Sequence, residues 1–388
     1  MSIYHDISAG ILKLNSQSFT PMSPEIVQTS SFYYETYEEY LEASADEKNH
    51  FLYTRGSNPT TVELEKMLAR LENGEKARVF GSGMGAISAT LLTLLKKGDH
   101  VLMLNTVYGA ALKFGQSLDK FGVELTNVNV EKAEDISQHI QPNTRIIYFE
   151  SPSSQRFEML DLEVIAKIAK ENNTYSVIDA TWASPIFQNP LNHSIDLVIH
   201  SLSKYVGGHS DLLGGVVIGS EDLVDEIYAH GHQFVGSVIS PMNSWLAIRG
   251  LRTLPIRMAY HSQSVTNFLD AIKDDKRISR IYHPYVGDEN QKKIAEKYLT
   301  GYGSLLSLEF VDEDFDKLKK FVNLLNYFSV GVSWGGFESL VLPSYSGKNS
   351  EKLKYRGLKK SHMRLFVGLE DTDTLIKDFK HAMDEVYK

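Results

Sequence analysis

The sequence predicts an α/β fold in which helices cover both faces of a mostly parallel sheet, followed by a smaller α+β domain. Three observations indicate this. Short apolar strands alternate with helical segments from about residue 60 to residue 220, which is typical of parallel sheets. Glycine-rich turns follow two of the strands. Near Arg249 the alternation gives way to a long helical segment and then to a mixed series of strands and helices.

Hydrophobic spacing locates the segments of the larger domain. Residues 60–73 carry apolar side chains at helical spacing, and Gly74 is expected to end that helix. A glycine turn at residues 81–85 is expected to lead into an apolar helix, and further helices are expected at residues 110–121 and in "LEVIAKIAKEN". The expected strands are "ARVF", "HVLML", "RIIYFE", "YSVIDA", "DLVIH" and "GVVIG".

The second half of the chain predicts a different pattern. Residues 249–275 read as one long helical connector with a kink at Pro255. Strands are then expected in "SLLSLEFV", "ESLVLP" and "HMRLFVGL", and helices in "DFDKLKKFVNLL" and at the C-terminus. We therefore divide the chain into an arm at residues 1–55 that contacts a neighbouring subunit, an α/β domain at 56–250 and a C-terminal domain at 251–388.

Composition excludes several classes of function. The chain has 388 residues and a formal net charge of -9 without a basic block, which argues against nucleic-acid binding. It contains no cysteine, so disulfides, thiolate nucleophiles and cysteine-ligated metals are excluded, and the histidine spacing predicts no metal site. The N-terminus does not resemble a secretory signal, and no apolar run reaches the length of a membrane span. We expect a cytoplasmic protein that acts on a small molecule.

A lysine after the strand "DLVIH" is the first candidate for chemistry. Lys204 follows Ser201 and Ser203 in "HSLSKYVGGHSDLLGG", and two glycine pairs come after it. Ligands of open parallel sheets bind at the carboxyl ends of the strands. A lysine at such an end, next to hydroxyl groups and bare backbone, is therefore a candidate for catalysis rather than for a surface ion pair.

Three other strand ends carry candidates. The turn that contains Ser82, Gly83 and Met84 exposes backbone N–H groups to an anion at a helix N-terminus, unless it is only a tight turn. Tyr108 follows "HVLML", where it could stack on a flat ligand or simply cover the surface. Asp179 closes a buried strand, where a carboxylate needs a cationic partner unless it caps a helix.

This combination fits one cofactor, pyridoxal 5′-phosphate (PLP). Lys204 would form the Schiff base with the aldehyde. Asp179 would pair with the protonated pyridine nitrogen and keep the ring a good electron acceptor. The amides of Gly83 and Met84, together with the two serine hydroxyls that precede the lysine, would hold the phosphate.

Taken together, these motifs resemble the Cys/Met-metabolism family of type I PLP-dependent enzymes. That family includes cystathionine γ-synthase, cystathionine β- and γ-lyases and methionine γ-lyase, and it implies an aspartate aminotransferase-like fold. The resemblance extends from about Pro24 to Glu370. Its segments are "FLYTRGSNPTTVELE", "GSGMGAI", "YGA", "VIDATWASP", "HSLSKYVGGHSD", "AIRGLRTLPIR" and "HMRLFVGLED".

The resemblance implies further roles. Tyr53 and Arg55 would reach the phosphate of the neighbouring subunit's cofactor, and Thr181 would lie next to the aspartate at the ring nitrogen. Arg364 would bind the substrate α-carboxylate in a bidentate manner. The family also implies a homotetramer made of two active dimers, with a sulfur amino acid as the substrate.

Two positions depart from the family pattern. Ala180 stands where the family usually has an asparagine, and Ser154 replaces the asparagine of the segment that here reads "ESPSSQ". Neither change removes an essential group, although both change the local contacts that the cofactor is expected to make.

The type of elimination depends on "VSWGGFESL", which resembles bacterial cystathionine β-lyases and would place Ser333 and Trp334 beside the substrate. The γ-specific members more often carry an acidic residue where Val332 stands, and methionine γ-lyases often carry a cysteine where Ala110 stands. The favoured interpretation is β-elimination of L-cystathionine to homocysteine, pyruvate and ammonia, with Lys204 as the base at Cα and Lys204 or Tyr108 as the donor to sulfur. The alternatives are a γ-lyase or γ-synthase, an aminotransferase, or a cofactor-binding protein without activity, and Trp334 could be core packing.

Overall fold

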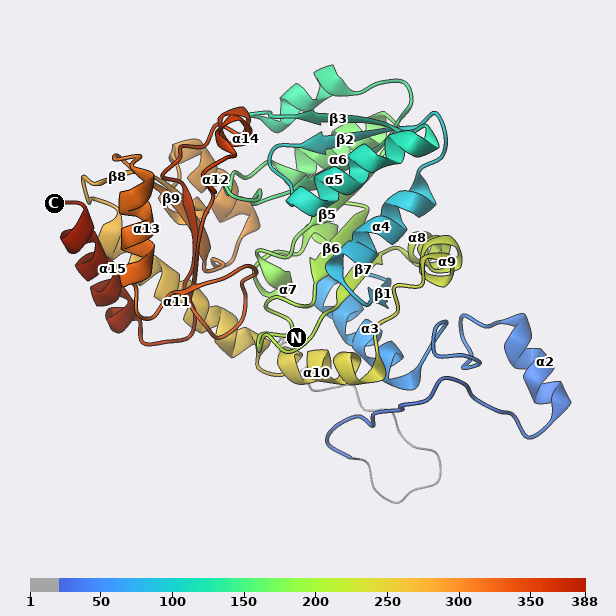
Figure 1. Ribbon diagram of the computed structural model, residues 1–388. Coiled ribbons are helices and arrows are strands. Elements are labelled where there is room, and N and C mark those ends of the chain that lie inside the picture. Colours follow the sequence, from blue (N-terminus) through green and yellow to red (C-terminus); the bar gives the residue numbers. More distant parts are fainter. Residues whose placement is uncertain (1–20) are drawn as a thin grey trace.

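The computed structural model describes residues 21–388, save the side chains of Lys352 and Tyr355. Two sheets, one of seven strands and one of five, lie side by side and are connected by a long helix (Figure 1). The first twenty residues of the predicted arm lie outside the described residues. Within the described part, no helix combines the length and the apolar character that crossing a bilayer requires.

The larger sheet has the strand order β1-β7-β6-β5-β4-β2-β3. Only β7 runs antiparallel to its neighbours, so the predicted mostly parallel sheet is confirmed. Sequence analysis missed the edge strand β3, because its side chains are only partly buried and lack a strong apolar pattern. The bounds are β1 Lys76–Phe80, β2 His100–Leu104, β3 Glu124–Val128, β4 Thr144–Glu150, β5 Tyr175–Asp179, β6 Leu197–Ser201 and β7 Gly215–Gly219.

Helices pack on both faces of this sheet. The alternation of side chains along a strand places Val216 and Ile218 of β7 in one core cluster with Leu68 of α3. Val217 of the same strand points to the opposite face and joins a cluster with Ile87 of α4. The helices of this region are α2 Tyr37–Ala45, α3 Pro59–Glu72, α4 Gly83–Leu94, α5 Gly109–Ser117, α6 Leu162–Glu171, α7 Ser184–Phe187, α8 Glu221–Glu226, α9 Gln233–Val235 and α10 Pro241–Leu251. Shorter 3₁₀ helices are η1 Leu118–Phe121, η2 Ala133–His139 and η3 Pro190–His193, and η4 Ile227–His232 is a π-helix.

Two local predictions were wrong. The helix α3 ends at Glu72, and the left-handed residue that terminates it is Asn73, with φ of 57°, while Gly74 follows and donates a hydrogen bond of 2.9 Å to the Ala69 carbonyl. Asparagine tolerates this conformation better than most residues, because its side chain can bond to nearby backbone. Pro255 does not kink one long helix. It lies in the first turn of α11, Leu254–Ile272, where its missing N–H costs nothing, and the helix before it ends at Leu251.

The smaller sheet has the order β10-β11-β12-β9-β8 and packs against α13 and α15 around a phenylalanine-rich core. Its strands are β8 Ile278–Tyr282, β9 Leu305–Phe310, β10 Ser329–Val330, β11 Leu340–Pro343 and β12 Met363–Phe366. Its helices are η5 Pro284–Val286, α12 Glu289–Tyr298, α13 Phe315–Leu324, α14 Ser350–Tyr355 and α15 Thr372–Val386.

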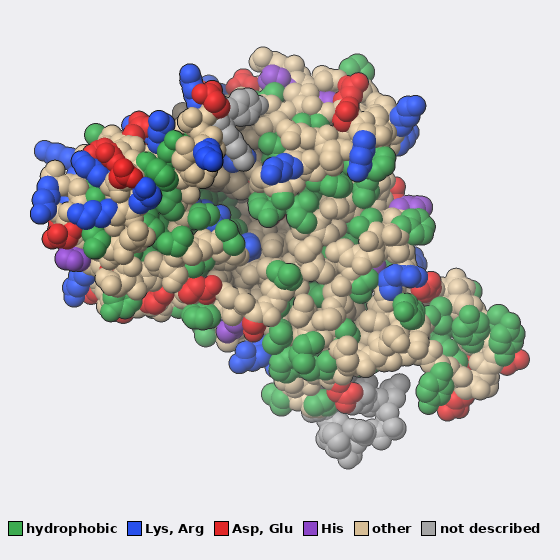
Figure 2. Space-filling model, in the orientation of Figure 1, with side chains coloured by type: hydrophobic (Ala, Val, Ile, Leu, Met, Phe, Trp, Pro, Cys, Tyr) green, Lys and Arg blue, Asp and Glu red, His purple; other side chains and the backbone are tan. Residues whose placement is uncertain are grey.

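The helix α11 contributes to both cores. Leu254 and Met258 at its start belong to the cluster beneath the larger sheet, whereas Val265 and Phe268 further along belong to the cluster of the smaller sheet. The domain limits proposed at residues 55 and 250 remain predictions. Between the two parts the surface is hollowed, and lysine and arginine side chains lie in the hollow (Figure 2).

Candidate active site

The carboxyl ends of the parallel strands meet along one edge of the larger sheet. Glu150 at the end of β4 lies opposite Asp179 at the end of β5. On the next strands, Ser201 at the end of β6 lies opposite Gly215 at the start of β7, and Phe80 at the end of β1 lies opposite the same glycine. The strand register therefore gathers the side chains that follow these strands.

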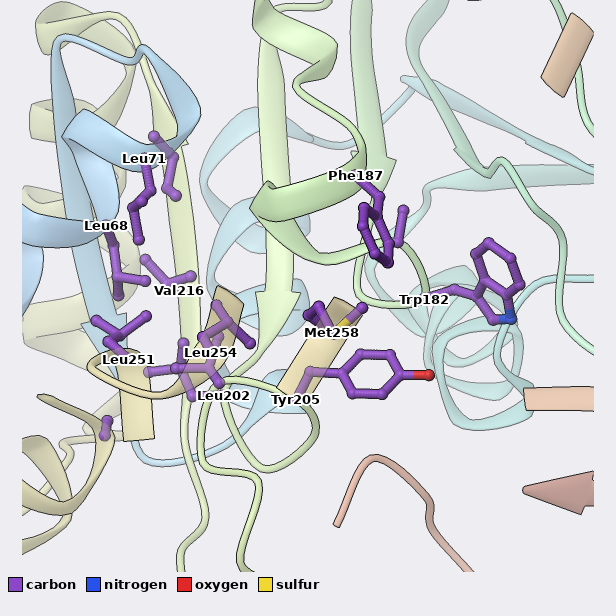
Figure 3. Close-up of a cluster of buried hydrophobic side chains, with 14 of the residues drawn as sticks. Leu68, Leu71, Trp182, Phe187, Leu202, Tyr205, Val216, Leu251, Leu254 and Met258 are labelled. Atoms are coloured by element: carbon purple, nitrogen blue, oxygen red, sulfur yellow. The ribbon is translucent and has the colours of Figure 1, made fainter. Parts of the chain in front are cut away.

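The backbone on both sides of Lys204 is fixed in the core. Leu202 and Tyr205 point into the buried cluster that Figure 3 shows, together with Leu254 and Met258 of α11. The Tyr205 hydroxyl accepts a hydrogen bond of 2.7 Å from the backbone N–H of Ser304 in the C-terminal domain. Lys204 therefore lies in a turn whose buried residues, Leu202 and Tyr205, cannot move without disrupting the core.

The amine of Lys204 lies against the C-terminal domain. Its Nζ donates a hydrogen bond of 2.6 Å to Ser333 Oγ and lies 5.7 Å from the centre of the Trp334 ring. Burial lowers the pKa of Lys204, the charge of Arg364 lowers it further, and only Asp179 acts in the opposite direction. A lowered pKa makes the free amine more available as a base near neutral pH.

The loop that carries Ser333 and Trp334 has an unusual backbone. Ser333 has a φ of 74° and Gly335 a φ of 87°. A Cβ atom on Gly335 would lie 2.8 Å from the backbone nitrogen of Tyr205, so only glycine lets the loop lie directly on the lysine turn. Arg364 on β12 donates a hydrogen bond of 3.1 Å to the Ser333 carbonyl. Trp334 both packs edge-on against Tyr205 and borders the lysine.

Asp179 is held by Thr181 rather than by a basic side chain. Its Oδ1 accepts hydrogen bonds of 3.0 Å from the Thr181 backbone N–H and 2.5 Å from the Thr181 hydroxyl, which itself accepts from the Ser201 N–H at 2.8 Å. Burial raises the pKa of Asp179. Among the described residues no cation forms a salt bridge with it, and His200 and Lys204 act on it only through their charge. It does not cap a helix either, because Ala183 precedes α7. The carboxylate is therefore suited to a cationic ligand atom.

Sequence analysis missed Glu150. Burial and the neighbouring charge of Asp179 raise the pKa of Glu150 to about 8. Its side chain accepts a hydrogen bond of 2.6 Å from Ser154 Oγ and another from the backbone N–H of Tyr108. The glutamate thus fixes the start of α5 and the position of Tyr108, whose side chain is 51% exposed. The strand-end argument used for Asp179 would also have selected it in "RIIYFE".

The N-terminus of α4 can accept an anion. Ser82 caps the helix through a hydrogen bond of 2.9 Å from the Gly85 N–H to its Oγ, while the first N–H groups of a helix have no partner within it. A Cβ atom on Gly83 would lie 3.1 Å from the Ser201 Cβ, so the two segments approach closely. The Ser203 hydroxyl accepts a hydrogen bond of 3.1 Å from the Gly214 N–H, which ties it to the following turn.

Tyr53 and Arg55 precede the residues at the strand ends in the sequence and form contacts of their own. Tyr53 forms a bridge with Ser31, and the Arg55 guanidinium lies 5.6 Å from the Tyr53 ring centre and bonds to Gln233 Oε1 at 3.3 Å. Both side chains are exposed. Their predicted role at a neighbouring subunit's cofactor, and the predicted tetramer, therefore stay predictions.

The residues at this edge fit PLP. A half-buried carboxylate without a salt-bridged cation suits a protonated pyridine nitrogen, the helix N-terminus suits a phosphate, and Lys204 offers an amine of lowered pKa. The candidate substrate groups Arg364, Ser333 and Trp334 approach the same amine from the C-terminal domain.

Comparisons with known proteins agree with this fit. Residues 8–384 match the family model described as Cys/Met metabolism PLP-dependent enzyme. L-methionine gamma-lyase from Fusobacterium nucleatum is 34% identical over 387 residues, 98% of this chain and 97% of that protein. Cystathionine beta-lyase from Lactococcus lactis is 33% identical over 370 residues, 94% of each. A putative O-acetylhomoserine (thiol)-lyase from Campylobacter jejuni, solved with a pyridoxyl-lysine monophosphate, has a TM-score of 0.90 at 27% identity and covers 99% of this chain and 100% of its own.

Proposed function

Because the chain belongs to the Cys/Met-metabolism family of PLP-dependent enzymes and is a carbon–sulfur lyase, we propose that it catalyses β-elimination of L-cystathionine. The reaction breaks the bond between Cβ and sulfur. One water molecule is consumed, and homocysteine, pyruvate and ammonia are formed. The family and the cofactor predicted from the sequence are confirmed, whereas the choice of this substrate and of this bond is the proposal.

The observation that carries the proposal is the surroundings of the Lys204 amine. Ser333 and Trp334 lie next to it, and Arg364 is joined to the same loop. β-Elimination needs one base at Cα and one proton for the departing sulfur. γ-Elimination needs a further proton removal at Cβ. Val332, where γ-specific members more often have an acidic side chain, is 76% exposed and cannot exchange a proton.

Each residue has a distinct task in this proposal. When bound, PLP supplies the electron acceptor for the carbon that loses its proton. Lys204 removes the Cα proton, and Arg364 binds the α-carboxylate so that the Cα–H bond faces the amine. Asp179 provides the negative charge that favours a protonated ring nitrogen. Lys204 or Tyr108 supplies the proton to the departing sulfur.

One observation favours γ-elimination as a second candidate. L-Methionine gamma-lyases of Fusobacterium nucleatum and Pseudomonas putida are 34% and 36% identical to this chain, while the Lactococcus cystathionine beta-lyase is 33% identical. Identities this close do not separate the two activities. The proposal for β-elimination therefore depends on the loop at residues 332–334 and not on overall similarity.

The products test the proposal directly. The purified holoenzyme is incubated with L-cystathionine, and the keto acid and the thiol are identified by mass spectrometry. Pyruvate with homocysteine is the expected result, whereas 2-oxobutyrate with cysteine would replace the proposal by γ-elimination. A parallel incubation with L-methionine is expected to release no methanethiol. Lys204→Ala is the control for reaction at this site.

A further inference from the structure

A small pocket lies beside Arg364 and is lined by a second arginine, Arg356. Its volume is about 190 Å³, which leaves room for roughly six groups of the size of water. The other polar lining residues include Gln155, Ser344 and Asn349, and none of the described residues that line the pocket is acidic. The pocket thus combines two cations with neutral hydrogen-bonding groups.

Arg356 is anchored on both sides. It follows α14, between the buried side chains of Leu353 and Leu358, and its backbone N–H donates a hydrogen bond of 3.0 Å to the Leu353 carbonyl. Its Nη1 donates a hydrogen bond of 3.0 Å to Gln155 Oε1. Its Nη2 would lie 3.7 Å from a Cβ atom on Gly109, the residue after the candidate stacking tyrosine. The guanidinium therefore reaches from the C-terminal domain to the loops at the edge of the larger sheet.

Neither arginine of the pocket is neutralised by an acidic side chain within residues 21–388. No salt bridge involves Arg356 or Arg364 there, and burial lowers the pKa of both guanidinium groups. The nearby Arg156 differs, because its guanidinium pairs with Glu158 at 2.7 Å. A partly buried cation without a counter-charge is costly, and an anionic ligand removes that cost.

Arg364, which lines the pocket, is also linked to the reacting amine through Ser333. Arg364 is bonded to the Ser333 carbonyl at 3.1 Å, and the hydroxyl of the same serine accepts from Lys204 at 2.6 Å. A substrate whose α-carboxylate is bound by Arg364 therefore has its Cα next to Lys204 and a second cation, Arg356, within the adjoining pocket.

We propose that Arg356 binds a second carboxylate of the substrate, carried by the part that leaves as the thiol. Arg356 would then be a specificity-determining residue that favours sulfur amino acids with an acidic group at each end over analogues with one. The inference rests on the proposed lyase function and adds to it a residue that decides between substrates. The guanidinium offers a planar pair of N–H groups that matches a carboxylate.

The test compares two substrates in one holoenzyme. L-Cystathionine and S-ethyl-L-cysteine share the α-amino acid end and both yield pyruvate by β-elimination, but only the first has a second carboxylate. In Arg356→Met, kcat/KM for L-cystathionine is expected to fall roughly tenfold to a hundredfold, as for a lost charged hydrogen bond. For S-ethyl-L-cysteine it is expected to change less than about twofold.

Two further variants separate recognition from folding. Lys354→Met removes an exposed charge two residues away and is expected to leave both substrates unchanged. Arg356→Lys retains a charge without the bidentate geometry and is expected to keep part of the preference for L-cystathionine. The cofactor absorbance and the melting temperature of each variant are compared with those of the wild type.

The outcomes that overturn the inference are distinct. An equal loss with both substrates in Arg356→Met would show that Arg356 supports the site or binds the α-carboxylate. No loss with either would place it outside the substrate path. Failure of the proposed function gives another result: the wild type would form no pyruvate from either substrate, or would form 2-oxobutyrate from L-cystathionine.

Discussion

The two sides of the candidate site are built in different ways. On the side of the larger sheet, Glu150, Asp179 and Lys204 stand at or just after strand ends, and backbone register places them. On the side of the C-terminal domain, Ser333 and Arg364 reach the amine through a loop with left-handed backbone and through long-range contacts. In the proposed assignment, the first side carries the groups for the cofactor and the second those for the substrate. Substrate choice can therefore change without disturbing the cofactor groups.

The largest loss of activity is expected from a substitution on the side of the larger sheet. Lys204→Ala removes the amine that would hold the cofactor and take the Cα proton, so turnover and the visible absorbance of bound cofactor should both be lost. Absorbance spectra and keto-acid assays measure this. The exposed Lys354→Ala should behave like the wild type. An active variant without Lys204 that keeps the wild-type spectrum would contradict the assignment.

A substitution on the side of the C-terminal domain is expected to cause a smaller loss of activity. Arg364→Ala should raise KM and lower kcat/KM by about tenfold to a few hundredfold, as for the loss of one charged hydrogen-bonding partner. The absorbance of bound cofactor should remain, which distinguishes this variant from Lys204→Ala. Steady-state kinetics with intact spectra would support the division between the two sides. Unchanged kinetics would remove Arg364 from the substrate site.

The contact between the two sides can be tested at Gly335. An alanine there would bring its Cβ 2.8 Å from the Tyr205 nitrogen, so Gly335→Ala should displace the loop from the lysine turn and lower kcat/KM. Gly98 offers a matched control, because it has a similar φ of 91° but nothing within 4 Å of its Cβ position. Gly98→Ala should cost about 1 kcal/mol of stability from backbone strain alone and keep the kinetics. Equal kcat/KM values in the two variants would show that the contact between the loop and the lysine turn is not needed for activity.

The smallest effect concerns pH. The pKa of Glu150 is raised from its ordinary 4.5 to about 8, so its contribution to stability is fully present below about pH 4.5 and is lost as the pH rises towards 8. Glu150→Gln, which resembles the protonated carboxyl, should avoid this loss. In the protein freed of cofactor, its melting temperature should match that of the wild type near pH 4.5 and exceed it by a few degrees near pH 8.5.

An exposed glutamate provides the comparison for this measurement. For Glu134→Gln, the difference in melting temperature from the wild type should not increase with pH. If the gap between Glu150→Gln and the wild type stays constant from pH 4.5 to pH 8.5, the pKa of Glu150 is not raised in the folded protein.

The same contrast explains what sequence could predict. Lys204 and Asp179 follow apolar strands, and strand ends are visible in the sequence. Glu150 also ends an apolar strand and was within reach of the same argument, but its pairing with Asp179 depends on how β4 and β5 align. Arg356 was missed for a stronger reason, since its neighbours Gln155 and Gly109 lie about two hundred residues or more away in the chain and no local pattern marks such a contact.

The helix α11 has a consequence for how the protein unfolds. Its first half packs in the core that holds the segment around Lys204, and its second half packs in the core beneath Arg364. Melting of either core exposes apolar side chains of a helix that the other core needs for its own packing. The two parts are therefore expected to lose their structure in one cooperative transition, and damage to the C-terminal core should weaken cofactor retention even where no residue touching the cofactor has changed.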